Sequence, residues 1–527
     1  MSAFERSAFG LPGLASLYAW PGWTTGGSIL VERVVTEDLD GDGRDDLAVH
    51  FTQHQSVEPD GMWGKTVTTP TPNRLVVFLA QADGSFVDAT AELFGTPEPV
   101  VLPGFSRKVD VGDLNGDGRP DWVYALNQED GRATDDLELL EATSAVVLSQ
   151  PGNGYRVVTF GEPSWHHAAR IYVSEGVGHV LAAGFGLMGK PMIGDWDDAV
   201  IGMHEAFILD ETGSQFVAAG AVPADPGTFV VLPPDQPGGI ASQVITVVTD
   251  TSTGPLNPVN FHPALLERDA TGQWTIADYR AVIDAERVPI VSWNGARGTT
   301  GVATIDGMPL MIPGYPESAL LRPTPGEDAV AVMWLQGQAL PQPREDGYYY
   351  ENDGQAYAKF EFYRAVDGQL LDADLRITGE RRFPGQSIFD FEVLDVNADG
   401  LEDIVAYPFS ATDRPDVYLN LGNREFMRLD DAVLPAGPLW SAPRGSGTAR
   451  FLDANGDGVQ DLLYFPSATL PQYYDGSNWE VHFVWRAHEL SGSVARNLSG
   501  FRVGDANTPK PGSMATGDPG HEVRGSA

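Results

Sequence analysis

Four copies of one nine-residue pattern constrain the fold of this chain more than any other feature of its sequence. Each copy has Asp or Asn at positions one, three and five, Gly at position six and Asp at position nine. Oxygen ligands at alternate positions of a tight loop suit a hard cation such as Ca²⁺, and Gly at position six permits the turn. The copies, named here the first to fourth Asp loops, are DLDGDGRDD (38–46), DLNGDGRPD (113–121), DVNADGLED (395–403) and DANGDGVQD (453–461).

The pattern predicts which residues coordinate each ion. Side chains at positions one, three, five and nine supply oxygen, and position seven supplies only its carbonyl oxygen. The predicted ligands are Asp38, Asp40, Asp42, Arg44 and Asp46 in the first loop, Asp113, Asn115, Asp117, Arg119 and Asp121 in the second, Asp395, Asn397, Asp399, Leu401 and Asp403 in the third, and Asp453, Asn455, Asp457, Val459 and Asp461 in the fourth. One ion per loop gives about four Ca²⁺ ions, which we expect to be structural because a fully ligated ion has no open position for chemistry.

The EF-hand is the nearest alternative interpretation of these loops. An EF-hand also needs a bidentate Glu at position twelve and a helix on each side. Here position twelve is Val49, Tyr124, Ala406 or Tyr464, none of which has a carboxylate. The runs that follow the loops, DLAVHF, DWVYAL, DIVAYP and DLLYFP, are typical of strands. We therefore expect each loop to join two strands of a β-hairpin.

The four loops resemble those of the FG-GAP or VCBS repeat family, the calcium-loop β-propellers typified by the head of integrin α-chains and by some fungal lectins. The resemblance implies an all-β propeller with structural calcium. It also implies that ligands bind on the face opposite the calcium loops.

A longer repeat predicts the number of blades. An apolar strand, a Gly turn and a large apolar residue recur seven times, with turn glycines Gly84, Gly152, Gly213, Gly272, Gly368, Gly422 and Gly476. Seven units of about four short strands favour a seven-bladed β-propeller, with each Asp loop between the first and second strands of its blade. We expect the propeller to span 28–507, between an N-terminal segment (1–27) and a flexible tail (508–527).

The same reading predicts details within the blades. In the last unit, residues 448–452, 461–466, 470–475 and 479–485 are expected to be four successive strands. The run FRVGDAN (501–507) is a candidate for a further first strand that closes the ring. Blades three to five lack the loop, although Asp195, Asp197 and Asp198 are a possible remnant of one.

Composition restricts the partners and the compartment. The formal net charge of −40 disfavours nucleic acid and anionic membranes. No cysteine is present, no apolar run approaches the length of a membrane span, and the first residues do not resemble a cleavable signal peptide. Calcium loops nevertheless imply millimolar calcium. We therefore expect an extracellular protein or one on a virion surface, either by itself or within a larger assembly.

Three long insertions, 52–73, 127–143 and 336–357, are the best candidates for ligand binding. They follow second strands, so they should lie on the face opposite the Asp loops. Trp63 in the first insertion and Tyr348, Tyr349 and Tyr350 in the third lie among polar residues, which suits a glycan; the same aromatic residues would equally suit packing against blades or a partner protein.

Catalytic signatures are weak. No Gly-x-Ser-x-Gly elbow, His-Glu-x-x-His helix or phosphate-binding loop occurs, and the His166–His167 pair is more typical of a loop or core than of a metal site. The sequence favours a non-catalytic recognition module for glycans or a partner protein. A polysaccharide lyase or hydrolase with its site in the central channel, and a purely structural subunit of a phage-like particle or surface assembly, remain as alternatives.

Overall fold

The computed structural model of the chain describes a defined set of residues. They are 5–9, 28–54, 73–83, 85–128, 141–152, 154–174, 176–185, 201–208, 214–215, 229–233, 243–249, 261–269, 274–279, 286–291, 297–305, 308–313, 317–339, 349–350, 355–378, 388–408, 415–429, 447–458, 460–466, 468–469 and 482–486. Within this part of the chain the structure is almost entirely β, with one short helix, α1 (Thr90–Leu93).

The described strands are hydrogen-bonded into six sheets. A six-stranded sheet contains β2 (Ser28–Glu37), β3 (Asp46–His54), β4 (Asn73–Ala80), β5 (Phe86–Asp88), β6 (Val100–Leu102) and β33 (Ala468–Thr469). A seven-stranded sheet contains β7 (Phe105–Gly112), β8 (Asp121–Asn127), β9 (Ala142–Gln150), β10 (Gly154–Ser174), β11 (Val177–Phe185), β12 (Ile201–Ile208) and β13 (Ser214–Gln215). A four-stranded sheet contains β14 (Phe229–Val231), β15 (Gln243–Thr249), β16 (Phe261–Arg268) and β17 (Trp274–Tyr279).

The remaining sheets come from the second half of the chain and its N-terminus. An eight-stranded sheet contains β18 (Glu286–Val291), β19 (Arg297–Ile305), β20 (Met308–Pro313), β21 (Glu317–Leu321), β22 (Val330–Ala339), β23 (Tyr349–Tyr350), β24 (Gln355–Val366) and β25 (Gln369–Asp372). A five-stranded sheet contains β26 (Arg376–Thr378), β27 (Ile388–Leu394), β28 (Asp403–Pro408), β29 (Asp416–Asn420) and β30 (Glu425–Arg428). A second four-stranded sheet contains β1 (Glu5–Phe9), β31 (Gly447–Leu452), β32 (Asp461–Pro466) and β34 (His482–Arg486).

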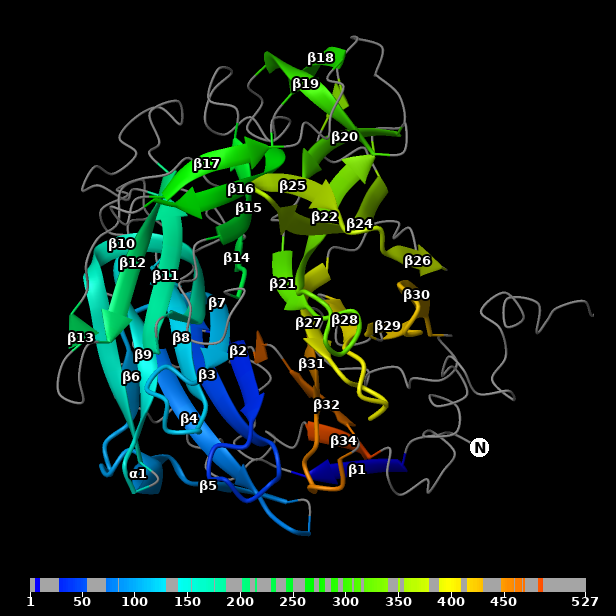
Figure 1. The fold of residues 1–527 in the computed structure, drawn as a ribbon. Helices are drawn as coiled ribbons and strands as arrows, with labels where there is room; N and C mark the ends of the chain where they lie inside the picture. The colour runs from blue at the N-terminus through cyan, green and yellow to red at the C-terminus, as the bar shows by residue number, and fades with distance from the viewer. Residues whose placement is uncertain are drawn as a thin grey trace, which may run out of the picture.

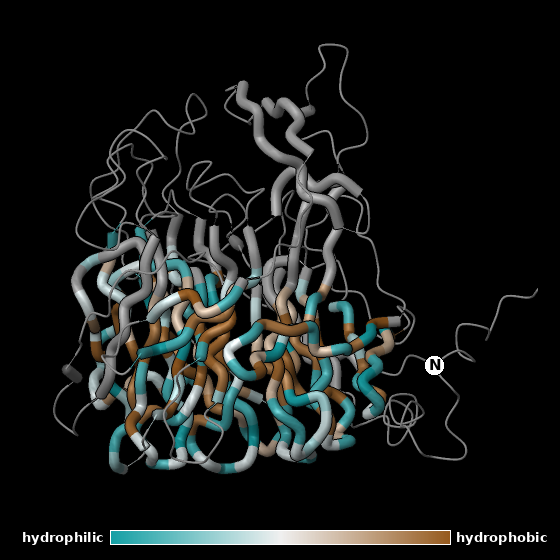
Figure 2. Tube along the Cα trace, turned by 45° about the horizontal axis from the view of Figure 1, so that its top comes forward, coloured by the Kyte–Doolittle hydropathy of each residue, from teal (hydrophilic) through white to brown (hydrophobic). Residues whose placement is uncertain are grey.

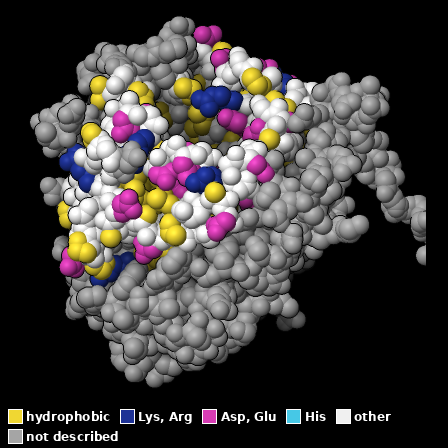
Figure 3. Space-filling view, turned by 90° about the horizontal axis from the view of Figure 1, so that it is seen from below, with side chains coloured by type: hydrophobic (Ala, Val, Ile, Leu, Met, Phe, Trp, Pro, Cys, Tyr) yellow, Lys and Arg dark blue, Asp and Glu magenta, His cyan; other side chains and the backbone are white. Residues whose placement is uncertain are grey.

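These sheets stand around a central space, which makes the molecule a β-propeller (Figure 1). A cavity of about 620 Å³ lies at the centre and is lined by residues from all six sheets, on strands β2, β7, β10, β14, β21, β27 and β31. Figure 3 shows this hollow from below, with basic and acidic side chains around it.

Apolar side chains fill the spaces between neighbouring sheets. One cluster joins β3 and β4 to β8 and β9 and includes the fully buried Trp122 and Tyr124. A further cluster lies within the seven-stranded sheet and joins β8 and β9 to β10 and β11. Others join β10 and β11 to β14–β17, β15 and β16 to β22–β25, β22 and β24 to β28–β30, and β3 and β4 to β31 and β32. Because each middle strand is covered on both faces, its sequence is a continuous apolar run, as in β8. Figure 2 shows these hydrophobic strands above hydrophilic turns.

The number of blades predicted from the sequence is wrong. The sequence predicts seven separate blades, and the described strands form fewer sheets than that. One reason is β10, a strand of 21 residues. Its first part pairs with β9 and its second part with β11, so two repeat units merge into one seven-stranded sheet. Spacing of turn glycines does not reveal a strand that continues from one unit into the next.

The N-terminal strand completes the last sheet. β1 pairs antiparallel with β34, with Glu5 opposite Arg486 and Phe9 opposite His482. β34 in turn pairs with β32, so it takes the third place in its sheet and β1 takes the fourth, although the sequence analysis expected residues 479–485 to be the fourth strand. The segments expected to be a third strand (470–475) and a closing strand (501–507) lie outside the described residues. The propeller thus includes residues 5–9, which belong to the segment 1–27 that we expect from the sequence to precede it.

Each Asp loop connects two adjacent antiparallel strands. The first strand ends immediately before position one, and the second begins at position nine, in all four loops: β2–β3, β7–β8, β27–β28 and β31–β32. The prediction of strands after the loops is confirmed. The predicted Gly turns are also found where the structure describes them, with Gly152, Gly368 and Gly422 all at positive φ. Among the described residues, no helix has the length and hydrophobicity needed to cross a bilayer.

Candidate metal-binding loops and the central cavity

The Asp at position one organises each Asp loop. The two carboxylate oxygens of Asp38 accept hydrogen bonds from the backbone N–H groups of positions four, five and six, at 2.7, 3.0 and 2.8 Å. Asp113 and Asp453 accept the same three bonds in their loops. Asp395 accepts the bonds from positions five and six. One side chain therefore sets a common conformation in all four loops.

The Asp at position nine connects its loop to the rest of the sheet. In Asp46, Asp121 and Asp403, Oδ2 accepts from the N–H group of position two, at 2.8, 2.7 and 3.0 Å. Their Oδ1 atoms accept from the next strand of the sheet. Those donors are the N–H groups of Ala80, Ser149 and Asn420, each at 2.7 Å. All three carboxylates are fully buried. Oδ2 of Asp121 also accepts from the N–H group of Asn115 at 3.3 Å. A carboxylate oxygen has two lone pairs, and those that these bonds leave are acceptor sites for a cation.

Burial also changes the ionisation of the position-nine carboxylates. It raises the pKa of Asp46 to about 7, against the opposing effect of the N–H groups that bind it, and the charges of Asp40 and Asp38 raise it further. Burial likewise raises the pKa of Asp121, and raises that of Asp403 well above its usual value. A neighbouring cation favours the ionised form of such carboxylates.

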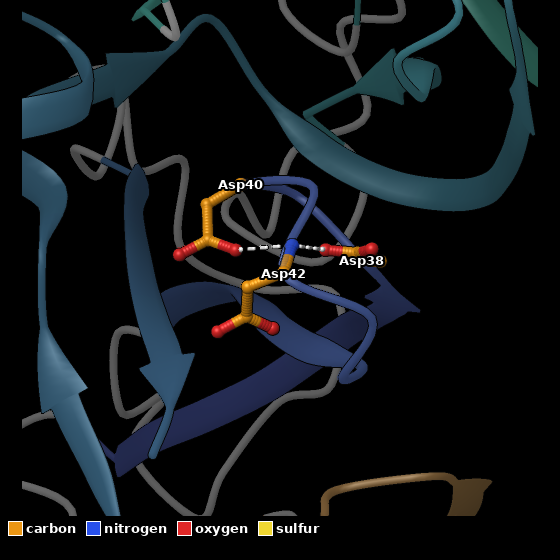
Figure 4. Close-up of side chains that lie close together, drawn as sticks. All are labelled: Asp38, Asp40 and Asp42. Atoms are coloured by element: carbon orange, nitrogen blue, oxygen red, sulfur yellow. Dashed lines mark hydrogen bonds between the residues drawn. The ribbon is translucent and has the colours of Figure 1, made fainter. Parts of the chain in front are cut away.

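The first Asp loop gathers three carboxylates. One oxygen each from Asp38, Asp40 and Asp42 lie within 4.8 Å of one another, an arrangement able to hold a metal ion (Figure 4). Oδ1 of Asp40 accepts a hydrogen bond from the N–H of Asp42, and Oδ1 of Asp42 accepts one from the N–H of Arg44. The Oδ2 atoms of Asp40 and Asp42 take no part in these two backbone hydrogen bonds. The Arg44 guanidinium forms an ion pair with Oδ2 of Asp42.

In the other loops position three is Asn, and its amide group replaces a carboxylate. The amide nitrogen of Asn115 lies 3.4 Å from Oδ2 of Asp117, and that of Asn397 lies 3.1 Å from Oδ2 of Asp399. In the fourth loop the amide nitrogen of Asn455 lies 3.4 Å from Asp461. An amide hydrogen partly neutralises these carboxylates, whereas the first loop has Asp40 at the equivalent position. The first loop thus has a fourth carboxylate among its predicted ligands, and the Arg44 guanidinium offsets part of its charge.

Position seven uses its side chain for packing. The Arg119 guanidinium donates to the carbonyl oxygens of Gln150 (3.1 Å) and Leu39 (2.9 Å) and covers the ring of Tyr155 at 4.5 Å. Arg44 donates from Nε to the carbonyl oxygen of Ala80 at 3.2 Å. These contacts leave the backbone carbonyl as the group that position seven offers to an ion. Val459, the residue at this position in the fourth loop, lies outside the described residues.

The central cavity is a second candidate site, which the sequence analysis did not resolve into residues. Its wall carries four basic and four acidic side chains, namely Arg33, Lys108, Arg170, Arg450, Glu37, Asp45, Asp110 and Glu392.

Two ion pairs lie in the cavity wall, one between two strands of the seven-stranded sheet (β7 and β10) and one between neighbouring sheets (β27 and β31). Arg170 lies 3.5 Å from Asp110, and Arg450 lies 3.1 Å from Glu392. Glu392 also accepts from the hydroxyl of Tyr407 at 2.6 Å, and the Arg450 guanidinium lies 4.6 Å from the centre of the Tyr407 ring. These groups fix one another's positions.

A regular spacing could have revealed this wall. Asp110, Glu392 and Arg450 each stand three residues before position one of an Asp loop. Successive side chains of a strand point to opposite faces, so the residues one, three and five positions before an Asp loop share a face. Polar residues at this offset in a buried strand are therefore a signal for the cavity.

The predicted aromatic ligand-binding residues are only partly placed. Tyr349 and Tyr350 form β23, which pairs parallel with Ile290 and Val291 of β18. Trp63 and Tyr348 lie outside the described residues, as do large parts of the three insertions. His166 of the histidine pair is buried, with Nδ1 2.7 Å from the Ser144 hydroxyl.

A comparison with protein families identifies one repeat in the chain. The family model described as FG-GAP-like repeat matches residues 63–124. This segment is an FG-GAP-like repeat. The match includes the whole second Asp loop, the strand β7 before it and the first four residues of β8 after it. The resemblance inferred from the Asp loops is thus confirmed. No curated relative matches the chain.

Several solved structures are distantly similar. They include a GH93 α-L-arabinofuranosidase of Fusarium graminearum with arabinobiose (12% identity, 72% of this chain and 91% of that chain, TM-score 0.34). An Agrocybe aegerita lectin that recognises non-reducing terminal N-acetylglucosamine is 12% identical (88% and 84% covered, TM-score 0.28). The exotype rhamnogalacturonan lyase YesX is 10% identical (87% and 72% covered, TM-score 0.35). Similarity at this level carries no information about activity.

Proposed function

We propose that this protein is a calcium-binding β-propeller that acts outside the cell or on a virion surface as a recognition module. The observation that carries the proposal is the cluster of Asp38, Asp40 and Asp42, with oxygens within 4.8 Å of one another. The position-one hydrogen bonds support it, because they recur in all four Asp loops.

The ions would be held by the oxygens of positions one, three, five and nine and by the carbonyl of position seven. A Ca²⁺ ion takes six to eight oxygen ligands, at 2.3–2.6 Å. It would offset the repulsion among carboxylates that the fold brings together, so its role is structural. The proposal includes about four ions, one for each loop.

Calcium titration tests this part of the proposal. We expect calorimetry to show about four Ca²⁺ sites, and thermal unfolding to shift upward in calcium relative to excess chelator. At a free concentration a hundredfold above the dissociation constant, each site adds about 2.7 kcal/mol of stability. Asp40→Asn should weaken one site and leave the others. An identical melt in calcium and in chelator would contradict the proposal.

Recognition is assigned to the face opposite the Asp loops. β3 and β8 run away from their loops, so the first two insertions begin at the opposite ends of their sheets. Binding of a glycan or a partner protein at that face would leave the ions in a supporting role. A glycan array in calcium tests this, with Tyr349→Ala and Tyr350→Ala as variants. Absence of binding to every sugar would instead favour a purely structural subunit.

An enzymatic function is the second candidate, and the central cavity favours it. Its wall holds the carboxylates of Asp110 and Glu392 beside Arg170 and Arg450. If the protein cleaves a polysaccharide there, Glu392→Gln and Asp110→Asn should abolish product release, whereas Tyr349→Ala should not. Product release that survives both cavity variants would exclude the cavity as the active site.

A further inference from the structure

The first and fourth Asp loops are joined by two hydrogen bonds, although 408 residues separate them. Oδ2 of Asp45 accepts from the N–H group of Asp453 at 2.7 Å. The N–H group of Asp45 donates to the carbonyl oxygen of Asp453 at 2.8 Å. Asp45 therefore holds both backbone polar groups of a single residue in the other loop.

The residue held in this way is the organising residue of the fourth loop. Its carboxylate accepts from the N–H groups of Gly456, Asp457 and Gly458 at 2.8, 3.1 and 2.6 Å. The backbone of Asp453 is thus fixed from the first loop, while its side chain fixes the conformation of the fourth.

The two loops are also closely packed. Gly456 approaches the first loop so nearly that a Cβ atom there would lie 3.0 Å from the carbonyl oxygen of Gly43 and 3.1 Å from Cγ of Arg44. A small displacement of either loop therefore also displaces the other.

The third loop provides a comparison at the same position. Position eight is Asp45 in the first loop and Glu402 in the third. Glu402 contacts Arg322, accepting from its N–H group and lying 3.6 Å from its guanidinium. Arg322 follows β21 and belongs to no Asp loop. Equivalent carboxylates therefore have different partners.

We propose that Asp45 is a positioning residue for the fourth Asp loop, so that the first loop supplies part of the fourth loop's cation site. The inference rests on the proposed calcium binding. When Asp45 holds the backbone of Asp453, the ordering of that residue is already achieved before an ion arrives, and the fourth loop binds more tightly as a result.

Calcium calorimetry on matched variants tests the inference. Asp45→Ala removes the acceptor, and we expect it to weaken one site about fivefold or more, the lower end of usual coupling between sites. Asp45→Asn keeps an oxygen acceptor and should stay within about twofold of the wild type. Glu402→Ala, the matched control, should bind calcium like the wild type. Circular dichroism in chelator confirms that each variant is folded.

Repeating the measurement in a variant whose fourth loop cannot bind calcium shows which loop Asp45 affects. Asp457→Ala disables the fourth loop, and in that background we expect Asp45→Ala to leave the remaining sites unchanged. Weakening that persists would place the effect of Asp45 in its own loop and overturn the inference.

The outcomes separate the inference from the proposed function. Wild-type protein that binds no calcium would overturn both. Wild-type protein that binds calcium, with Asp45→Ala binding it equally well, would overturn only the role of Asp45. If Asp45→Ala does not fold, Asp45→Asn still decides, because a loss of about fivefold in that variant contradicts a role that depends on the acceptor oxygen.

Discussion

At the scale of single residues, the Asp at position nine has two tasks that the sequence pattern does not separate. The pattern predicts a metal ligand. The structure shows in addition that Asp46, Asp121 and Asp403 each connect position two of their loop to the next strand through two backbone hydrogen bonds. These carboxylates therefore support the fold whether or not an ion is bound.

Replacing one of these carboxylates by its amide separates the two tasks. Asp121→Asn places an NH₂ group against a backbone N–H group, so one buried donor loses its acceptor. In excess chelator we expect a loss of about 1.5–3 kcal/mol in the free energy of unfolding, measured with urea. Asp40→Asn keeps the acceptor for the N–H of Asp42 and should cost less than about 0.5 kcal/mol in the same assay. Equal losses in the two variants would refute this role.

His50 predicts an acid-sensitive stability. The imidazole is fully buried on β3 against the ring of Tyr124, at 5.3 Å, and neither nitrogen has a hydrogen-bond partner among the described residues. Burial lowers its pKa from 6.5 to about 4, with the smaller influences of Glu32 and Arg33 opposing each other. Because the folded state disfavours the proton, the stability associated with neutral His50 is complete above pH 6.5 and is lost as the pH falls toward 4.

The matching experiment is urea unfolding of wild type and His50→Phe across this pH range. Near pH 7.5 the two proteins should differ by less than about 1 kcal/mol, since an aromatic ring is kept in an apolar site. Near pH 4.5 the variant should be the more stable by roughly 2 kcal/mol, because a shift of one pKa unit corresponds to about 1.4 kcal/mol. If the free energy of unfolding falls equally in both proteins between pH 7.5 and 4.5, His50 is not responsible for the acid sensitivity.

At the scale of the loop, position four distinguishes the third Asp loop from the others. This position has positive φ in all four loops, with values of 81°, 74°, 55° and 75°. Glycine occupies it in three loops, and Ala398 occupies it in the third. A residue with a Cβ atom is strained in this conformation. The third loop is therefore the one with stored backbone strain.

An exchange at position four measures that strain. Ala398→Gly should raise the free energy of unfolding by about 0.5–1 kcal/mol, the cost of a left-handed Ala less the extra entropy of unfolded Gly. Gly116→Ala, at a position with open space around it, should lower it by a similar amount. Both are measured in chelator so that ion binding does not contribute. A lower free energy of unfolding for Ala398→Gly, or a higher one for Gly116→Ala, would contradict the assignment.

The same elements show how far the sequence alone could lead. Local patterns located the strands beside the Asp loops, because a run such as DWVYAL is apolar throughout and its strand is covered on both faces. They did not reveal the length of β10 or the pairing of β1 with β34, because strand pairing depends on partners far away in the chain. Nor did they reveal the contact between Asp45 and Asp453, which exists only after the ring has formed.

At the scale of the whole molecule, the two ends of the described chain meet in one sheet. β1 is the outermost strand of the sheet that contains β31, β32 and β34. Without β1, the backbone groups of β34 would form an exposed edge, which other chains can pair with.

Deleting residues 1–9 tests the importance of this closure. We expect a loss of at least about 2 kcal/mol in the free energy of unfolding, together with concentration-dependent association seen by light scattering. Deletion of 508–527, which the composition predicts to be a flexible tail, serves as the control and should change neither. A monomeric deletion variant with wild-type stability would show that β1 is dispensable.

The pairing of β1 with β34 also has a consequence for synthesis on the ribosome. Glu5 is made 481 residues before its partner Arg486. At roughly 5–20 residues per second, β1 waits on the order of half a minute or more without its partner. Most of the sheets can assemble in order during that time, but the last one cannot. The nascent protein therefore passes through an open, nearly complete ring, a stage at which a chaperone would find an unpaired strand at each end.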